Sequence, residues 1–273
     1  MVSRPRFWFY VFGPYIVGLV AGAASLDDVV TVPNALFALY FLLPANLLIY
    51  GVNDIFDHET DKLNEKKASY EMLVSRDRHR SLVLAILLFN LPFLVAAFIF
   101  VPGAWLSLTA FLFFSIFYSA PPIRAKAVPF LDSAFNILYV FPGAFAYQMM
   151  TGEFPPLMIM LAAGFWTAAM HAYSAIPDIE ADREAGLQTI ATFCGPYLTL
   201  AICAFLYTAA AVASFPYLGF VSVSLGSIYL IMMAASAQSL RTGRLFKLYR
   251  AFPLINVLAG FTLFWAIALQ KFF

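Results

Sequence analysis

Residues Phe7–Leu26 read FWFYVFGPYIVGLVAGAASL, a run of twenty residues without a charged side chain. A helix needs about 20 apolar residues to cross the hydrocarbon core of a bilayer. The whole chain of 273 residues has the same character, because 63% of it is hydrophobic and only 11% is charged. Soluble domains carry about 25% charged residues. The sequence therefore predicts an integral membrane protein.

Further charge-free runs predict the other helices. Four of them have the length of a single span: Val29–Asn53, Ser133–Gly152, Phe154–Pro177 and Ala251–Gln270. Ser81–Ile123 and Ala185–Leu240 are long enough for two spans each. They divide at Val101–Gly103 and near Pro216, because proline and glycine suit a turn better than a helix interior. We expect an all-α bundle of nine transmembrane helices that forms one domain over residues 1–273.

The positions of Lys and Arg predict the orientation. With the N-terminus inside, the cytoplasmic segments are 1–6, 53–80, 121–132, 177–195 and 238–250, and they hold every Lys and Arg except Lys271. Basic residues concentrate on the cytoplasmic side of membrane proteins. We therefore expect a multi-pass protein of the cytoplasmic membrane, surrounded by lipid, with its C-terminus outside and no nucleic-acid partner.

The predicted helices suggest an internal repeat. Helices one to four and five to eight have the same layout, and in each half the second helix ends inside at an acidic cluster. Asn53 and Asp178, the first residues of the two clusters, are 125 residues apart. A parallel repeat is a common arrangement in membrane bundles and would bring both clusters to one cytoplasmic mouth. We expect two four-helix repeats followed by a ninth helix.

The two clusters predict a metal site. They hold seven of the 15 acidic residues, although carboxylates are costly beside a membrane unless a cation compensates them. On a helix Asn53, Asp57 and Asp61 share one face that Asp54 borders, and Asp178 and Asp182 form an i, i+4 pair. Oxygen ligands of this kind favour Mg²⁺ or Ca²⁺, and Mg²⁺ usually binds a few carboxylates together with substrate phosphate oxygens. The predicted metal ligands are Asn53, Asp54, Asp57, Asp61, Asp178 and Asp182, around a diphosphate.

Basic residues lie at the same membrane face. The stretch Tyr118–Lys126 ends the fourth predicted helix, and its Arg124 and Lys126 are placed to neutralise a leaving diphosphate. The alternative is that these two charges only set the topology. His171 lies seven residues before Asp178. A histidine at that depth usually hydrogen-bonds a neighbouring helix, and a role as a base or a substrate contact is the alternative.

At these residues the chain resembles the UbiA superfamily of intramembrane prenyltransferases. The family pattern is Asn-x-x-x-Asp-x-x-x-Asp followed by Asp-x-x-x-Asp, and nine helices and the Tyr118–Lys126 segment also match. The resemblance implies Mg²⁺ held by both motifs and a diphosphate contacted by basic residues such as Lys126 and Lys67. Together with the residue reasoning it predicts a diphosphate-binding set of Asn53, Lys67, Tyr118, Arg124 and Lys126. The predicted catalytic residues are Asp57, Asp61, Lys126, Asp178 and Asp182.

Two further features bear on the acceptor. Many quinone-type members continue the first motif with Asn-x-x-Lys-x-x-Arg-Pro, whereas this chain has Asn64 and Lys67 followed by Tyr70-Glu71. The stretches Ser3–Trp8 and His171–Gly186 look most like the carotenoid branch, the lycopene elongases. That resemblance implies prenyl transfer from dimethylallyl diphosphate to lycopene or a related carotenoid, a hydrophobic lipid-soluble acceptor.

Other functions stay open at this point. Within prenyl transfer, the acceptor is alternatively a quinone precursor or a glycerol phosphate ether. From another class, a cation-coupled transporter also carries acidic residues, but it binds its ions near the bilayer midplane. Here both clusters lie at the predicted cytoplasmic helix ends.

Overall fold

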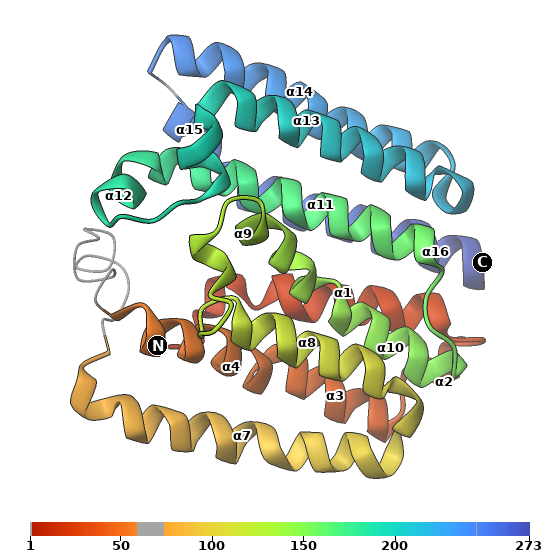
Figure 1. The fold of residues 1–273 in the computed structure, drawn as a ribbon. Helices are drawn as coiled ribbons and strands as arrows, with labels where there is room; N and C mark the ends of the chain where they lie inside the picture. Colours follow the sequence, from red (N-terminus) through yellow and green to blue (C-terminus); the bar gives the residue numbers. More distant parts are fainter. Residues whose placement is uncertain (1, 59–73, 244) are drawn as a thin grey trace. The chain divides into compact units, whose positions relative to one another are not determined.

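The computed structural model describes residues 2–58, 74–243 and 245–273, and in these residues all regular structure is helical (Figure 1). The predicted all-α class is therefore confirmed. Among the described residues, six helical stretches are long and apolar enough to cross a membrane: Val32–Phe56, Arg76–Phe100, Leu157–Glu184, Ile190–Leu218, Phe220–Arg241 and Leu245–Phe272. Phe9–Gly22 and Pro102–Phe117 are shorter apolar helices. The predicted count of nine spans is not confirmed, because the run Ser133–Gly152 is divided among several short helices.

The chain forms two compact units, and each is described by itself. Unit 1 comprises Met1–Arg124 and Phe141–Phe154. Its elements are η1 (Pro5–Phe7), α1 (Phe9–Gly22), α2 (Leu26–Val29), α3 (Val32–Leu42), α4 (Pro44–Phe56), η2 (Arg76–Arg78), α7 (His79–Phe100), η3 (Pro102–Ala104), α8 (Trp105–Phe117) and α10 (Phe141–Thr151). The predicted division of the run Ser81–Ile123 is confirmed, since η3 separates α7 from α8 at Pro102.

α10 packs closely against α1 within unit 1. A Cβ atom on Gly143 would lie 2.7 Å from the carbonyl oxygen of Pro14, so only glycine permits this approach of the two backbones. In the predicted repeat, the run Ser133–Gly152 was the first helix of the second half. In the structure, the part of this run that forms α10 belongs to unit 1. The repeat itself stays a prediction.

The second predicted span is interrupted before the first acidic cluster. Leu43 has non-helical angles (φ −124°, ψ −64°), and Pro44 starts α4. Proline removes a backbone donor, which leaves carbonyl groups of the preceding turn without a partner. The buried Asn46 amide donates to the carbonyl oxygens of Phe41 and Leu42, both at 3.0 Å. The break therefore redirects α4, the helix that carries Asn53 and Asp54, at little hydrogen-bonding cost.

Unit 2 comprises Ala125–Val140 and Pro155–Lys271. Its elements are η4 (Ala125–Ala127), α9 (Leu131–Ala134), η5 (Phe135–Tyr139), α11 (Leu157–Ala175), η6 (Ile176–Asp178), α12 (Ile179–Glu184), α13 (Ile190–Leu218), α14 (Phe220–Arg241), α15 (Leu245–Tyr249) and α16 (Phe252–Phe272). α13 and α14 meet through the stacked rings of Tyr207 and Tyr229, whose centroids are 4.3 Å apart. The turn between them lies at Gly219 (φ 53°), three residues after the predicted Pro216, because glycine tolerates a positive φ angle.

Candidate active site

The first acidic motif lies where α4 ends. Asn53 and Asp54 occupy its last turn, and Asp57 caps it with φ −101° and ψ 4°. The helix predicted to run through Asp57 therefore stops at Phe56, since short acidic side chains favour helix ends over helix interiors. The backbone N–H of Asp57 still donates to the carbonyl oxygen of Asn53 at 2.9 Å. Asp61 and Lys67 lie outside the described residues.

One hydroxyl group brings Asn53 and Asp57 together. The Ser119 Oγ lies 3.3 Å from Asn53 Oδ1 and 3.3 Å from Asp57 Oδ2. The two oxygens therefore lie near the same hydroxyl group, although the predicted helix ends before Asp57. Asp57 is only 1% exposed. A carboxylate buried to this degree requires compensation by a cation.

Arg124 is one such cation. Its Nη2 lies 4.0 Å from Asp57 Oδ1. Its Nε is buried and donates no hydrogen bond to any group in the described part of the chain. Arg124 also has a positive φ angle of 44°, a conformation that costs a non-glycine residue about 1–3 kcal/mol. The guanidinium group thus lies beside Asp57, and 42% of the Arg124 side chain is exposed.

Arg4 pairs with the other described acid of this motif. Its Nη2 lies 2.8 Å from Asp54 Oδ1, and its guanidinium carbon lies 5.0 Å from the centroid of the Tyr50 ring. Arg4 shares the left-handed backbone conformation of Arg124, with φ 45°. Sequence reasoning gave no reason to expect this pair, because 50 residues separate its members. The charge of Asp54, a predicted metal ligand, is therefore already matched by a protein cation.

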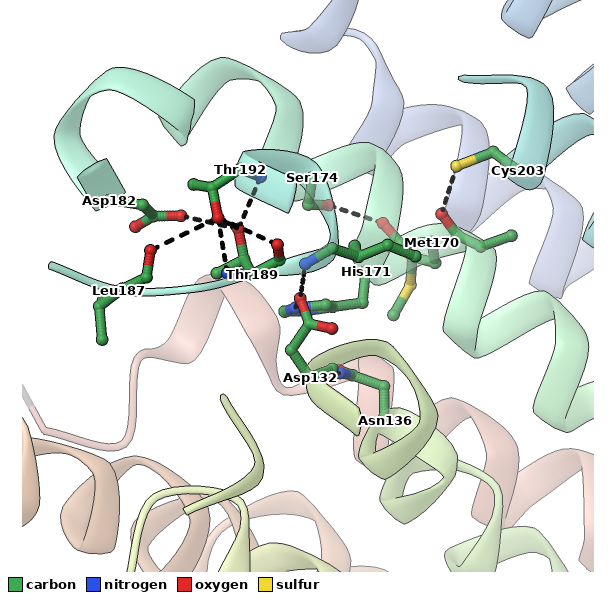
Figure 2. A network of polar contacts seen from close by, with 12 residues as sticks. Asp132, Asn136, Met170, His171, Ser174, Asp182, Leu187, Thr189, Thr192 and Cys203 are labelled. Atoms are coloured by element: carbon green, nitrogen blue, oxygen red, sulfur yellow. Dashed lines mark hydrogen bonds and ion pairs between the residues drawn. The ribbon is translucent and has the colours of Figure 1, made fainter. Parts of the chain in front are cut away.

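The second motif has a related local structure. Asp178 ends η6 and caps α12 with φ −101° and ψ 3°, nearly the same backbone angles as Asp57. Asp182 lies one turn later in α12, so the predicted i, i+4 pair runs from the cap into the helix. The hydroxyl group of Thr189 lies 3.5 Å from Asp182 Oδ2 (Figure 2). The shared angles at Asp57 and Asp178 are what a repeated motif would show.

Two more predicted residues lie at the ends of short segments. Tyr118 is the C-cap residue of α8, and Lys126 is the middle residue of η4. Both are half-buried. Their predicted contacts with a diphosphate stay predictions.

A buried acid that sequence reasoning missed lies in the second unit. Asp132 is fully buried, accepts a hydrogen bond of 2.8 Å from the backbone N–H of Ile190, and lies 3.7 Å from His171 Nε2 (Figure 2). Because residues 121–132 were assigned to a cytoplasmic segment, Asp132 was interpreted as a loop residue. The apolar neighbours on its N-terminal side, Val128–Leu131, were the available signal.

The donor atoms fit Mg²⁺ better than a softer metal. Asn53, Asp57, Asp178 and Asp182 all offer oxygen, and Mg²⁺ prefers a few protein oxygens supplemented by water and phosphate. Within residues 2–58, 74–243 and 245–273, no group of three or more His, Cys, Asp or Glu side chains is arranged to hold a metal ion alone. The oxygen atoms of the two motifs are thus of the type that Mg²⁺ prefers.

Comparison with known proteins decides the family. The model of the UbiA prenyltransferase family matches residues 11–266. The chain belongs to this family. It is therefore an enzyme, a prenyltransferase, and a multi-pass membrane protein.

Several curated relatives are similar over most of the chain. A lycopene elongase/hydratase of Haloferax volcanii is 42% identical over 267 residues, which cover 95% of this chain and 85% of that protein. One from Halobacterium salinarum is 38% identical, over 95% of this chain and 93% of that protein. These similarities confirm the resemblance to the carotenoid branch.

Solved structures of the family share the fold. A UbiA homolog from Archaeoglobus fulgidus bound to GPP and Mg²⁺ has a TM-score of 0.72 and 23% identity, with 98% of each chain covered. The same protein bound to DMAPP and Mg²⁺ gives a TM-score of 0.71. Membership in an enzyme family excludes the transporter alternative.

Proposed function

We propose that this UbiA prenyltransferase transfers a prenyl group from dimethylallyl diphosphate to lycopene or a related carotenoid, with Mg²⁺ as cofactor. The observation that carries the chemistry is Asp57, a carboxylate 1% exposed that converges with Asn53 on Ser119 and faces Arg124. Support for the acceptor comes from relatives named lycopene elongase/hydratase, which are 38–42% identical over 95% of the chain.

The roles follow from the two motifs. Asn53, Asp54, Asp57, Asp61, Asp178 and Asp182 hold Mg²⁺, and Asn53, Lys67, Tyr118, Arg124 and Lys126 bind the diphosphate. When bound, Mg²⁺ neutralises the charge that develops on the leaving diphosphate. Of the acids in the first motif, Asp57 is better placed than Asp54 for this role, because Arg4 already balances Asp54.

The protein's own groups act at three points. Arg124, whose side chain is 42% exposed, donates to a diphosphate oxygen, which stabilises the anion as the carbon–oxygen bond breaks. Ser119 holds the oxygens of Asn53 and Asp57 in one orientation. The apolar helices keep water from the allylic cation until the acceptor double bond attacks it.

The assay offers purified protein, Mg²⁺ and dimethylallyl diphosphate with one acceptor at a time, and identifies the products by mass. We expect a prenylated carotenoid from lycopene. Turnover with a quinone precursor, and none with lycopene, would overturn the carotenoid assignment.

A second acceptor class has an observation in its favour. A digeranylgeranylglyceryl phosphate synthase of Ignicoccus hospitalis is 28% identical over 247 residues, covering 83% of this chain and 77% of that protein. The same assay therefore includes a glycerol phosphate ether. Because this relative is less similar to the chain than the lycopene elongase/hydratases are, a glycerol phosphate ether is the weaker candidate for the acceptor.

The motif carboxylates are tested by isosteric changes. We expect Asp57→Asn and Asp182→Asn each to reduce product formation about 100-fold or more, because removing one charge-stabilising group in an active site has an effect of this size. Excess Mg²⁺ should restore part of the activity if the loss is in metal affinity. Asp27→Asn, the same change at an exposed acid before α3, serves as control and should leave the rate unchanged.

Orientation and domain count complete the proposal. We propose that the N-terminus and both motif loops face the cytoplasm, that the C-terminus lies outside, and that residues 1–273 act as one domain in the cytoplasmic membrane. The distribution of Lys and Arg supports the orientation.

A further inference from the structure

Among the described residues outside the two motifs, Asp132 is the most deeply buried acid. It lies in the first turn of α9 with no exposed surface, and its Oδ1 has no hydrogen-bond partner among the described residues. Its Oδ2 accepts from the backbone N–H of Ile190, the first residue of α13, in the short stretch of that helix before its kink at Gly195 (φ 73°). Phe130, two residues earlier, has φ 68°, a strained conformation for a bulky residue. Burial, a missing partner and strain together mark a functional position.

His171 is the group that faces this carboxylate. Its Nε2 lies 3.7 Å from Asp132 Oδ2, which exceeds a normal hydrogen-bond length, and its side chain is 20% exposed. Figure 2 shows the imidazole ring of His171, a residue of α11, beside the Asp132 carboxylate. Catalytic hydrogen bonds are often long without substrate and shorten when it binds. The carboxylate favours the tautomer with the proton on Nε2, in which Nδ1 is the basic nitrogen.

Asp132 and His171 are connected to both acids of the second motif. His171 precedes Asp178 by seven residues along α11 and the 3-10 helix η6, so it lies about two turns before Asp178 in the chain, within α11. On the other side, Ile190 follows Thr189, whose hydroxyl group contacts Asp182. If Asp178 and Asp182 bind the diphosphate end of the donor, His171 lies on the deeper, apolar side, where the hydrocarbon must lie.

We propose that His171 is the proton acceptor of the reaction and that Asp132 is its positioning residue, an inference that rests on the proposed function. The carbon–oxygen bond of the donor breaks, and its electron pair leaves with the diphosphate. The π electrons of the acceptor double bond form the new carbon–carbon bond, which leaves a cation on the acceptor.

The proton then moves to His171. A carbon–hydrogen bond next to the cation breaks, its electron pair forms the new double bond, and Nδ1 of His171 takes the proton. If water captures the cation instead, the same nitrogen takes the proton that the water loses. In both cases the Asp132 carboxylate stabilises the imidazolium ion that forms.

The test measures prenylated product and released diphosphate in parallel, with the same donor and lycopene. We expect His171→Gln to reduce product formation by about 100-fold or more, which is the usual effect of losing a general base. The KM for dimethylallyl diphosphate should stay unchanged. Diphosphate release should fall less than product formation, because ionisation does not need the base. A rate of prenylated product within threefold of the wild-type rate would overturn the proposal. An equal loss of prenylated product and of released diphosphate would also overturn it.

Further variants separate catalysis from structure. Asp132→Asn keeps an oxygen that can accept from Ile190, and we expect kcat to fall about 10-fold or more at an unchanged KM. The double variant Asp132→Asn/His171→Gln should be no slower than His171→Gln alone, since the two residues act as a unit. Additive losses would overturn the pairing.

Added imidazole should restore part of the activity of His171→Ala, which a purely structural histidine would not allow. Ser174→Ala serves as control: its hydroxyl group donates to the Met170 carbonyl one turn back in α11, and we expect an unchanged rate. Wild-type protein that forms no prenylated product from any acceptor would overturn the proposed function and this inference with it. Product from the wild type and an undiminished His171→Gln would overturn only the inference.

Discussion

Arg4 and Arg124 both adopt left-handed backbone angles beside a carboxylate of the first motif. L-residues other than glycine rarely do so, because Cβ then crowds the carbonyl oxygen. The surrounding structure must hold each arginine in place against this cost. A guanidinium group that is held in advance loses little entropy when an anion binds.

Two substitutions at Arg124 separate strain from charge. Arg124→Gly and Arg124→Ala both remove the cation, but only glycine relieves the backbone. We expect both variants to lower product formation about 10-fold or more. We expect the glycine variant to be more stable than the alanine variant by about 1 kcal/mol. Activity and thermal unfolding in detergent measure the two effects. Equal stability of the two variants would contradict the strain argument.

The pair of Arg4 and Asp54 is suited to a double-mutant cycle. Arg4→Gln and Asp54→Asn each leave one partner of a largely buried ion pair without its opposite charge, which is costly. We therefore expect each single change to destabilise the protein and the double change to cost less than the sum, with a coupling free energy of about 1–3 kcal/mol. Unfolding free energies in detergent supply all four values. Strict additivity would show that the pair contributes nothing.

Between elements, the contact of α1 with α10 depends on glycine. Gly143→Ala would place a Cβ atom 2.7 Å from the carbonyl oxygen of Pro14, a backbone atom that can move only with its helix. We expect a loss of about 1–3 kcal/mol in unfolding free energy, the usual cost of overpacking. Gly13→Ala in α1 is the control, since no atom lies within 4 Å of its added Cβ, and it should not destabilise the protein.

The long apolar helices were the most predictable part of the fold, because the thickness of the bilayer sets the length of a charge-free run that can cross it. The break at Leu43 was missed, although Pro44 signals it, since run length alone does not show where a helix bends. In the site, the i, i+4 spacing predicted that Asn53 and Asp57 share one face of a helix, whereas that helix ends at Phe56. The contacts of Asp54 with Arg4 and of Asp132 with Ile190 could not be predicted, because each joins segments 50 or more residues apart.

For the whole molecule, the proposed orientation predicts where reporters fold. A reporter that is active only outside the cytoplasm should be active when fused after Glu153 and inactive when fused after Arg250. A reporter that is active only in the cytoplasm should give the opposite pattern. The segments predicted to be cytoplasmic hold nearly all the basic residues, so a reversed pattern would contradict the positive-inside argument.

The membership of α10 in unit 1 constrains the order of biosynthesis. Ribosomes deliver the chain from its N-terminus, so Met1–Arg124 enters the membrane before α10, the partner of α1, does. Until Phe141–Phe154 has followed, the face of α1 that packs against α10 must be covered by lipid, by the insertion machinery or by a neighbouring chain. Nascent protein that stalls after Arg124 is thus a half-assembled intermediate, and membrane chaperones would have to protect it.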